Sequence, residues 1–194
     1  MAERIVDSDL SLRGALADNP VNPCPEEIRS TLGLMEVVYW GFDAKEHIGQ
    51  LVLAESVMAD VDEFFKQALD MRFPIEKVVL ASDPRYSWDD EKLMADNASS
   101  GFNYRLIAGT DRPSLHGRGL AFDINTRLNP YIRWERGKKI VRPTGAVWDK
   151  TKAGTLHADH PLVKLMEGFG WEWGGSWTKE GKGVIDYQHF EKHL

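Results

Sequence analysis

The sequence predicts a single α+β domain in which a mostly antiparallel sheet is flanked by helices. Segments rich in valine, tyrosine and tryptophan are interleaved with helical patterns, but the two do not follow the βαβ order that a parallel sheet requires. The chain has 194 residues, of which 42% are hydrophobic, so one domain can bury a sizeable core. We divide it into an N-terminal arm, residues 1–34, and the main domain, residues 35–194.

The arm is marked by a run of structure-breaking residues, Asn-Pro-Cys-Pro at 22–25, and we expect it to lie on the domain. The main domain opens with a strand predicted over 34–40, because this segment is rich in valine, tyrosine and tryptophan. A turn at 41–43 then leads to a partner strand over 48–54. The domain therefore begins with a hairpin.

A helix is predicted next, over 57–71, with Ser56 in position to cap its N-terminus. Its apolar residues fall on one stripe, which is typical of a helix packed on a core: Val57, Val61, Phe64, Phe65, Ala68 and Leu69. A strand over 77–81 follows. A capping pattern at 87–90 then predicts a short helix that runs to Met94.

The second half of the chain contains strands predicted over 102–108 and 120–125 and a helix over 161–169, which begins with a proline at its first position. A short strand is predicted over 171–173. Residues 126–157 show no strong periodicity, so we expect a long excursion over the surface. A loop of that length in a small domain usually has a function.

Composition excludes several classes of protein. The net charge of −6 and the pI near 5.5 argue against a dedicated nucleic-acid binder. Cys24 is the only cysteine, so no internal disulfide can form. No apolar run approaches the ~18 residues of a membrane span, and residues 1–15 lack the apolar core of a signal peptide. We expect a monomer without a transmembrane segment.

The stretch from 114 to 125 carries the chemistry. Glycines at 117 and 119 let the backbone turn sharply after His116, and the strand alternation sends Asp123 to the face opposite the apolar one. His116 and Asp123 can thus converge on one point, and His189 is the best third ligand that the chain offers. Two imidazoles and one carboxylate are typical of a catalytic zinc with an open fourth position. The mixed nitrogen and oxygen ligands favour zinc over iron or copper, and we expect one zinc per chain.

Three sequence blocks carry a family resemblance. The pattern S-x-H-x-x-G-x-A-x-D-I-N at 114–125 is followed by G-W-x-W-G-G-x-W at 170–177 and by D-x-x-H-F-E at 186–191. Together they resemble the zinc D-Ala-D-Ala metallopeptidases, which include bacterial D-alanyl-D-alanine carboxypeptidases and the L-alanyl-D-glutamate endopeptidases of bacteria and phage. The resemblance runs from about Glu36 to Glu191. It implies a Hedgehog- or DD-peptidase-like fold, a zinc cofactor and peptidoglycan peptides as the partner.

The resemblance also implies two catalytic residues. Asp186 stands where the family has its general base, which is often a glutamate, and the spacing to His189 predicts a turn over 186–188. Arg105, which shares a strand face with Asn103, matches the arginine that polarises the scissile carbonyl. The structural alternative for Asp186 is a role in capping the turn. The alternative for Arg105 is a surface salt bridge.

Two residues are candidates for substrate binding. Ser114 matches a family residue near the substrate, and Trp173 belongs to a cluster of indoles of which at least one should be core and one could form a wall of the groove. A second metal cluster at His157 and His160 is rejected, because Asp159 between them has an ordinary helix-capping role.

We therefore expect a zinc peptidase that acts on peptidoglycan stem peptides in the cell envelope or outside the cell. It would cleave either the terminal D-Ala-D-Ala bond or the internal L-Ala-D-Glu bond. The alternative is a non-catalytic, zinc-containing module for wall binding or signalling on the same fold. Asp186 together with Arg105 favours the peptidase.

Overall fold

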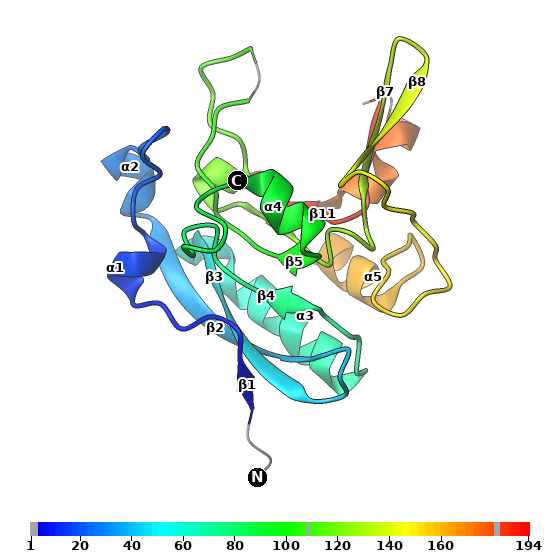
Figure 1. Cartoon of the computed structure of the whole chain (residues 1–194), viewed down its shortest axis with the longest axis horizontal. Coiled ribbons are helices and arrows are strands. Elements are labelled where there is room, and N and C mark those ends of the chain that lie inside the picture. Colours follow the sequence, from blue (N-terminus) through cyan, green and yellow to red (C-terminus); the bar gives the residue numbers. More distant parts are fainter. Residues whose placement is uncertain (1–3, 108, 181–182) are drawn as a thin grey trace.

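The longest strands, β2 (Leu32–Trp40) and β3 (Glu46–Ala54), pair as an antiparallel hairpin. The computed structural model, which describes residues 4–107, 109–180 and 183–194, is shown in Figure 1. In it α3 (Met58–Asp70) lies along this hairpin and buries four residues of the predicted apolar stripe, Val61, Phe64, Phe65 and Ala68, while Leu69 is only partly buried. The N-terminal segment adds β1 (Ile5–Val6) to the outer side of β3, in parallel.

The remaining elements are short. They are α1 (Leu12–Ala15), α2 (Glu26–Arg29), β4 (Lys77–Val78), α4 (Asp90–Ala95), β5 (Ala98–Ser99), β6 (Ala121–Asp123), β7 (Tyr131–Glu135), β8 (Lys138–Arg142), α5 (Pro161–Gly168), β9 (Glu172–Trp173), β10 (Val184–Asp186) and β11 (His189–Glu191), with 3-10 turns at Glu55–Val57, His116–Arg118 and Gly174–Glu180. Among the described residues the strands form several small sheets instead of one, with orders β1-β3-β2, β10-β7-β8, β6-β11-β9 and β4-β5. The class is α+β, as expected, and most but not all of the pairing is antiparallel.

One aromatic cluster joins the hairpin layer to the strands of the second half. Phe64 of α3 contacts the rings of Phe122 on β6 and Phe190 on β11 edge-on, at centroid distances of 5.3 and 5.7 Å. All three rings are fully buried. Removing such a ring typically costs about 3–5 kcal/mol, so this contact fixes β6 and β11 on the core.

Two sequence-based expectations about the second half are wrong. Residues 102–107 do not form a regular strand, because their backbone groups bond to several different partners: the Phe102 amide donates to the Val52 carbonyl and the Asn103 amide to the His116 carbonyl. Residue 108, the expected end of that strand, lies outside the described residues. The excursion over 126–157 contains the hairpin β7–β8, whose turn at Arg136-Gly137 has positive φ at both positions.

Charged residues weaken the alternating strand pattern of that hairpin, and Arg-Gly is a weaker turn signal than Asn-Gly.

The N-terminal caps of α3 and α5 also differ from the ones that the sequence predicts. Ser56 lies inside a 3-10 turn that leads into α3 and makes no cap bond. At α5 the cap is the His160 side chain, which accepts from the Leu162 amide, and not Asp159.

Candidate metal centre and active-site cleft

The β6–β11 pairing brings together two of the expected metal ligands. In this antiparallel pair His189 lies directly opposite Asp123, and the next pair, Phe190 and Phe122, points to the core. His116 comes from the turn before β6. Gly119 closes that turn at φ 68°, and a Cβ there would lie 2.5 Å from the Ala54 amide nitrogen, so only glycine fits.

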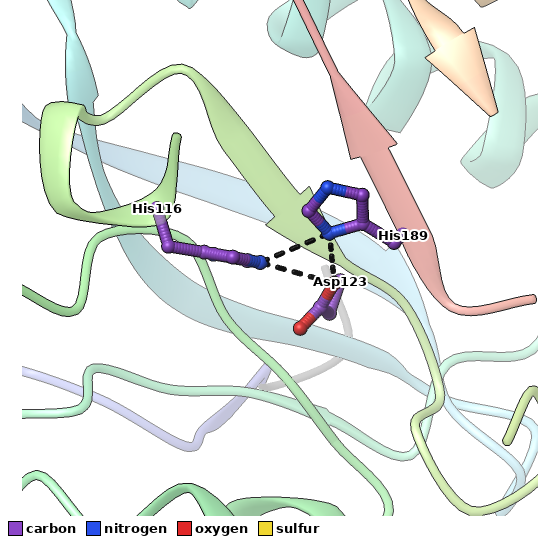
Figure 2. Close-up of side chains that lie close together, drawn as sticks. All are labelled: His116, Asp123 and His189. Carbon is purple, nitrogen blue, oxygen red and sulfur yellow. Dashed lines mark hydrogen bonds and ion pairs between the residues drawn. The ribbon is translucent and has the colours of Figure 1, made fainter. Parts of the chain in front are cut away.

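The three side chains converge on one point, as Figure 2 shows. His116 Nε2 lies 3.0 Å from His189 Nδ1 and 3.3 Å from Asp123 Oδ1, and His189 Nδ1 lies 3.0 Å from the same oxygen. Ligands bound to zinc at about 2.0–2.1 Å in a tetrahedron are about 3.3 Å apart. The observed separations are therefore close to those that a zinc ion requires.

The outer nitrogen of each imidazole fixes which nitrogen faces the centre. His116 Nδ1 lies 2.7 Å from the Gly101 carbonyl and His189 Nε2 lies 3.0 Å from the Glu191 carboxylate, so each of these nitrogens donates. In the neutral rings, the facing nitrogens then present lone pairs, beside a carboxylate oxygen. Three acceptors this close repel one another unless a cation lies between them.

The charges around the centre attract a cation. Burial opposes ionisation of Asp123, but His116 and His189 outweigh it and hold the pKa of that carboxyl well below its usual range. Burial likewise opposes a charged His189, but Asp123 and Glu191 raise the pKa of this imidazole to about 10. Either a proton or a metal ion can neutralise the negative charge at this centre, so the two compete for the site.

Asp186 lies at the end of β10, one turn before His189. The chain turns at Tyr187-Gln188, close to the turn that the spacing predicts. The Asp186 side chain is buried, and its Oδ1 has no hydrogen-bond partner among the described residues. Burial raises the pKa of this carboxyl to about 7, and the Asp123 carboxylate adds to the rise, while His189 and Arg105 oppose it.

Arg105 is held by a carboxylate that the sequence does not point to. Its guanidinium lies 2.9 Å from Asp90 Oδ2, and Asn103 donates to the other oxygen of Asp90 over 2.6 Å. Asp90 is the first residue of α4, which Asp89 caps. Asn103 and Arg105 thus share a partner, as well as a side of the segment. In the sequence Asp90 belongs only to the capping pattern at 87–90, so its contact with Arg105 is revealed only by the packing of α4 against this segment.

These side chains line a cleft of about 870 Å³. Its lining comes from residues 105–107 and 112–118, from β6, β7 and β10, and from Trp177 and the C-terminal segment. His116, Asp123, His189, Asp186 and Arg105 all line it. The expected metal ligands and the expected catalytic pair therefore share one cavity.

Residues 108–192 match the family model described as D-alanyl-D-alanine carboxypeptidase. This is the family that the motifs predict. The matched segment holds the three expected ligands and Asp186, whereas Arg105 and Asp90 precede it. Neither the curated proteins nor the solved structures include a significant match to the chain.

The two candidate substrate-binding residues differ in their positions. Ser114 lines the cleft, where its hydroxyl accepts from the Gly117 amide at 3.0 Å. Trp173 does not line it: the indole is 3% exposed and donates to the Tyr187 carbonyl at 2.9 Å, so it packs in the core. Trp177 lines the cleft instead, with its ring 5.2 Å from that of His189.

Tyr131 also lines the cleft and has no counterpart among the sequence-based candidates. It lies opposite Asp186 in the β7–β10 pair. Burial raises the pKa of its phenol, and the Asp186 carboxylate adds to the rise. The phenol is therefore a protonated hydrogen-bond donor near Asp186. Residues 126–157 show no strong periodicity, so the sequence does not predict the strand that places Tyr131 beside Asp186.

Two further groups of titratable residues are less suited to hold a metal ion, and the first of them shares Glu191 and His193 with the cleft lining. Glu172, Glu191 and His193 could hold a second metal, but His193 is largely exposed. The His157 and His160 rings contact each other edge to face, and His160 serves as a helix cap. Among the described residues no helix has the length and apolar character needed to cross a membrane.

Proposed function

We propose that this protein is a zinc-dependent peptidase that hydrolyses peptidoglycan stem peptides, as a D-Ala-D-Ala carboxypeptidase or an L-Ala-D-Glu endopeptidase. One observation carries the proposal: the metal-facing atoms of His116, Asp123 and His189 meet within 3.0–3.3 Å in a cleft that also contains the buried carboxyl of Asp186. The match of residues 108–192 supplies the peptidase class. The action of that family on cell-wall peptides suggests a location in the envelope or outside the cell.

His116, Asp123 and His189 would hold the zinc ion. When bound, zinc supplies Lewis acidity toward a carbonyl oxygen and a water molecule. The Glu191 carboxylate, 3.0 Å from His189 Nε2, keeps that imidazole in the orientation and tautomer that a ligand needs. The Gly101 carbonyl does the same for His116.

Asp186 is the proposed general base. Its carboxyl has a pKa raised to about 7, close to a working pH near neutrality, and one of its oxygens is buried without a partner in the described structure. Such a group can take a proton from the attacking water and return it to the leaving amine. The motif resemblance implies this role, and the burial of the carboxyl supports it.

Arg105 is the proposed electrostatic partner of the scissile carbonyl. A guanidinium fixed by Asp90 costs little reorganisation when negative charge develops on the carbonyl oxygen. Tyr131 and Ser114 line the same cleft and are candidates for contacts with the peptide.

Mass spectrometry of purified muropeptides after incubation with the zinc-loaded protein tests the proposal. Loss of a terminal alanine identifies a carboxypeptidase, and a cut after L-alanine identifies an endopeptidase. Unchanged muropeptides, with one zinc bound per chain, would reject the peptidase and favour the non-catalytic wall-binding or signalling module. Metal analysis of the same sample provides the control for loading.

A further inference from the structure

The hairpin β7–β8 has a charge opposite to that of the rest of the chain. Residues 131–142 hold five basic residues and one glutamate, so their net charge is +4, whereas the whole chain carries −6 and the remainder therefore −10. Two of the five basic side chains have carboxylate partners, Arg133 with Glu135 and Arg142 with Glu91. No ion pair among the described residues involves the other three basic side chains, which belong to Arg136, Lys138 and Lys139.

The same hairpin exposes a large aromatic ring. Trp134 is 49% exposed and lies directly opposite Lys139 in the strand register. Directly opposed residues share a face of the sheet, so the indole and a free ammonium group lie side by side. An aromatic face beside cations suits a ligand that has both the C–H surface of sugar rings and negative charges.

The hairpin begins at the cleft, whose lining includes Tyr131. In the sheet β10-β7-β8, Asp186 lies opposite Tyr131, and Tyr131 lies opposite Arg142. Alternate residues share a face, so the face that carries Asp186 continues outward to Lys138, about 13 Å further along β8 at the usual strand rise. Trp134 and Lys139 lie on the opposite face of the hairpin, so the hairpin presents cations on both faces and the indole on the face away from Asp186. Figure 1 shows the hairpin projecting beyond the body of the domain.

We propose that the β7–β8 hairpin is a docking arm for polymeric peptidoglycan, which offers sugar rings together with the carboxylates of its stem peptides. The inference rests on the proposed function for its choice of partner. A membrane surface fits less well, because Trp134 is the only large exposed hydrophobic residue of the hairpin and the tip, residues 135–138, is polar. The −10 charge of the remaining chain disfavours nucleic acid as the partner.

The first test measures binding without catalysis. Zinc-loaded protein is incubated with purified insoluble peptidoglycan and then centrifuged, at about 50 mM and about 500 mM NaCl, because exposed charges are screened by salt. The wild type should sediment with the polymer at low salt. The double variant Lys138→Glu/Lys139→Glu and the variant Trp134→Ala should each lower the bound fraction, the former about tenfold. A matched double reversal on α3 and α5, Lys66→Glu/Lys164→Glu, should not.

The second test measures cleavage. The hairpin variants should cut soluble muropeptides as the wild type does, but should cut insoluble peptidoglycan more slowly. Binding of the hairpin variants at the wild-type level would overturn the docking arm, as would wild-type binding to anionic lipid vesicles or duplex DNA as tight as to peptidoglycan. A wild type that cuts no soluble muropeptide would instead overturn the proposed function, and the sedimentation result would still decide the docking arm.

Discussion

Two groups of histidine and aspartate in this molecule, each built on a buried histidine, differ in the direction of their side chains. At the candidate metal centre, His116, Asp123 and His189 turn acceptor atoms toward one point. Near the N-terminal strand, the single ring of His47 lies between two carboxylates, with Nδ1 2.8 Å from Asp7 and Nε2 3.0 Å from Asp43. The Tyr39 hydroxyl donates to Asp7 as well.

The comparison shows that residue types do not define a metal site. In the His47 group both ring nitrogens already bond to carboxylates on opposite sides, so no common point is left for an ion. This group fastens the segment after β1 to the β2–β3 hairpin. At the metal centre, the outer nitrogens have partners and the inner ones face each other. Convergence of ligand atoms from three side chains on one point is therefore the feature that indicates a cation.

The sharpest separation of the two groups is His116→Ala against His47→Ala. The first should abolish stoichiometric zinc and all activity, because two remaining ligands rarely hold the ion. The second should keep about one zinc per chain and lose only stability, by about 1–3 kcal/mol, since the partly buried Asp7 carboxylate loses a partner. Metal analysis and urea unfolding measure the two effects. Zinc loss in His47→Ala with retention in His116→Ala would reverse the assignment.

Within the metal centre, Asp186→Asn should separate proton transfer from metal binding. Asparagine has nearly the same size but accepts no proton at neutral pH, so turnover should fall by ~100- to 10,000-fold. The ligands are unchanged, so zinc content should stay at the wild-type level. Activity within a few-fold of wild type would leave Asp186 as a turn residue, and Glu191 would then be tested as the base. Loss of zinc would make Asp186 a ligand.

Substitutions at Arg105 and Asp90 should lower turnover by different amounts while leaving zinc bound. Arg105→Lys keeps the charge but loses the planar fork, and turnover should fall by ~100- to 1000-fold. Asp90→Asn keeps an acceptor for Arg105 without the charge, so a smaller fall, of about tenfold, is expected. Both variants should fold and bind zinc. Steady-state kinetics of the zinc-loaded variants check the order, and Arg105→Lys with wild-type turnover would place that guanidinium outside the reaction.

The smallest expected effect is a pH dependence from the His47 group. Burial opposes the charged ring, but Asp43 and Asp7 outweigh it and raise the pKa of His47. A raised folded-state pKa stabilises the fold fully below the ordinary value of about 6.5. This contribution is lost as the pH rises through the folded-state value. Thermal unfolding of zinc-loaded wild type and His47→Gln between pH 5.5 and 9 should therefore converge at high pH. A difference in unfolding temperature between the two proteins that stays constant over this pH range would contradict the prediction.

Local sequence was sufficient for features that depend on neighbouring residues. The alternation of Leu120, Phe122 and Ile124 with Asp123 determines which face of the strand the carboxylate takes, and the glycine at 119 determines the turn before it. The apolar stripe of α3 and the turn before His189 follow from spacing in the same way. These are properties of a few consecutive residues, so the sequence displays them directly.

Only the tertiary structure decided the contacts between distant segments. The register that sets His189 opposite Asp123 depends on the packing of β6 and β11 together on Phe64, and no short pattern encodes it. The same holds for Asp90 beside Arg105 and for Trp177, not Trp173, in the cleft wall. Such choices depend on how whole elements share one core, because burial of each side chain is settled by all of its neighbours at once.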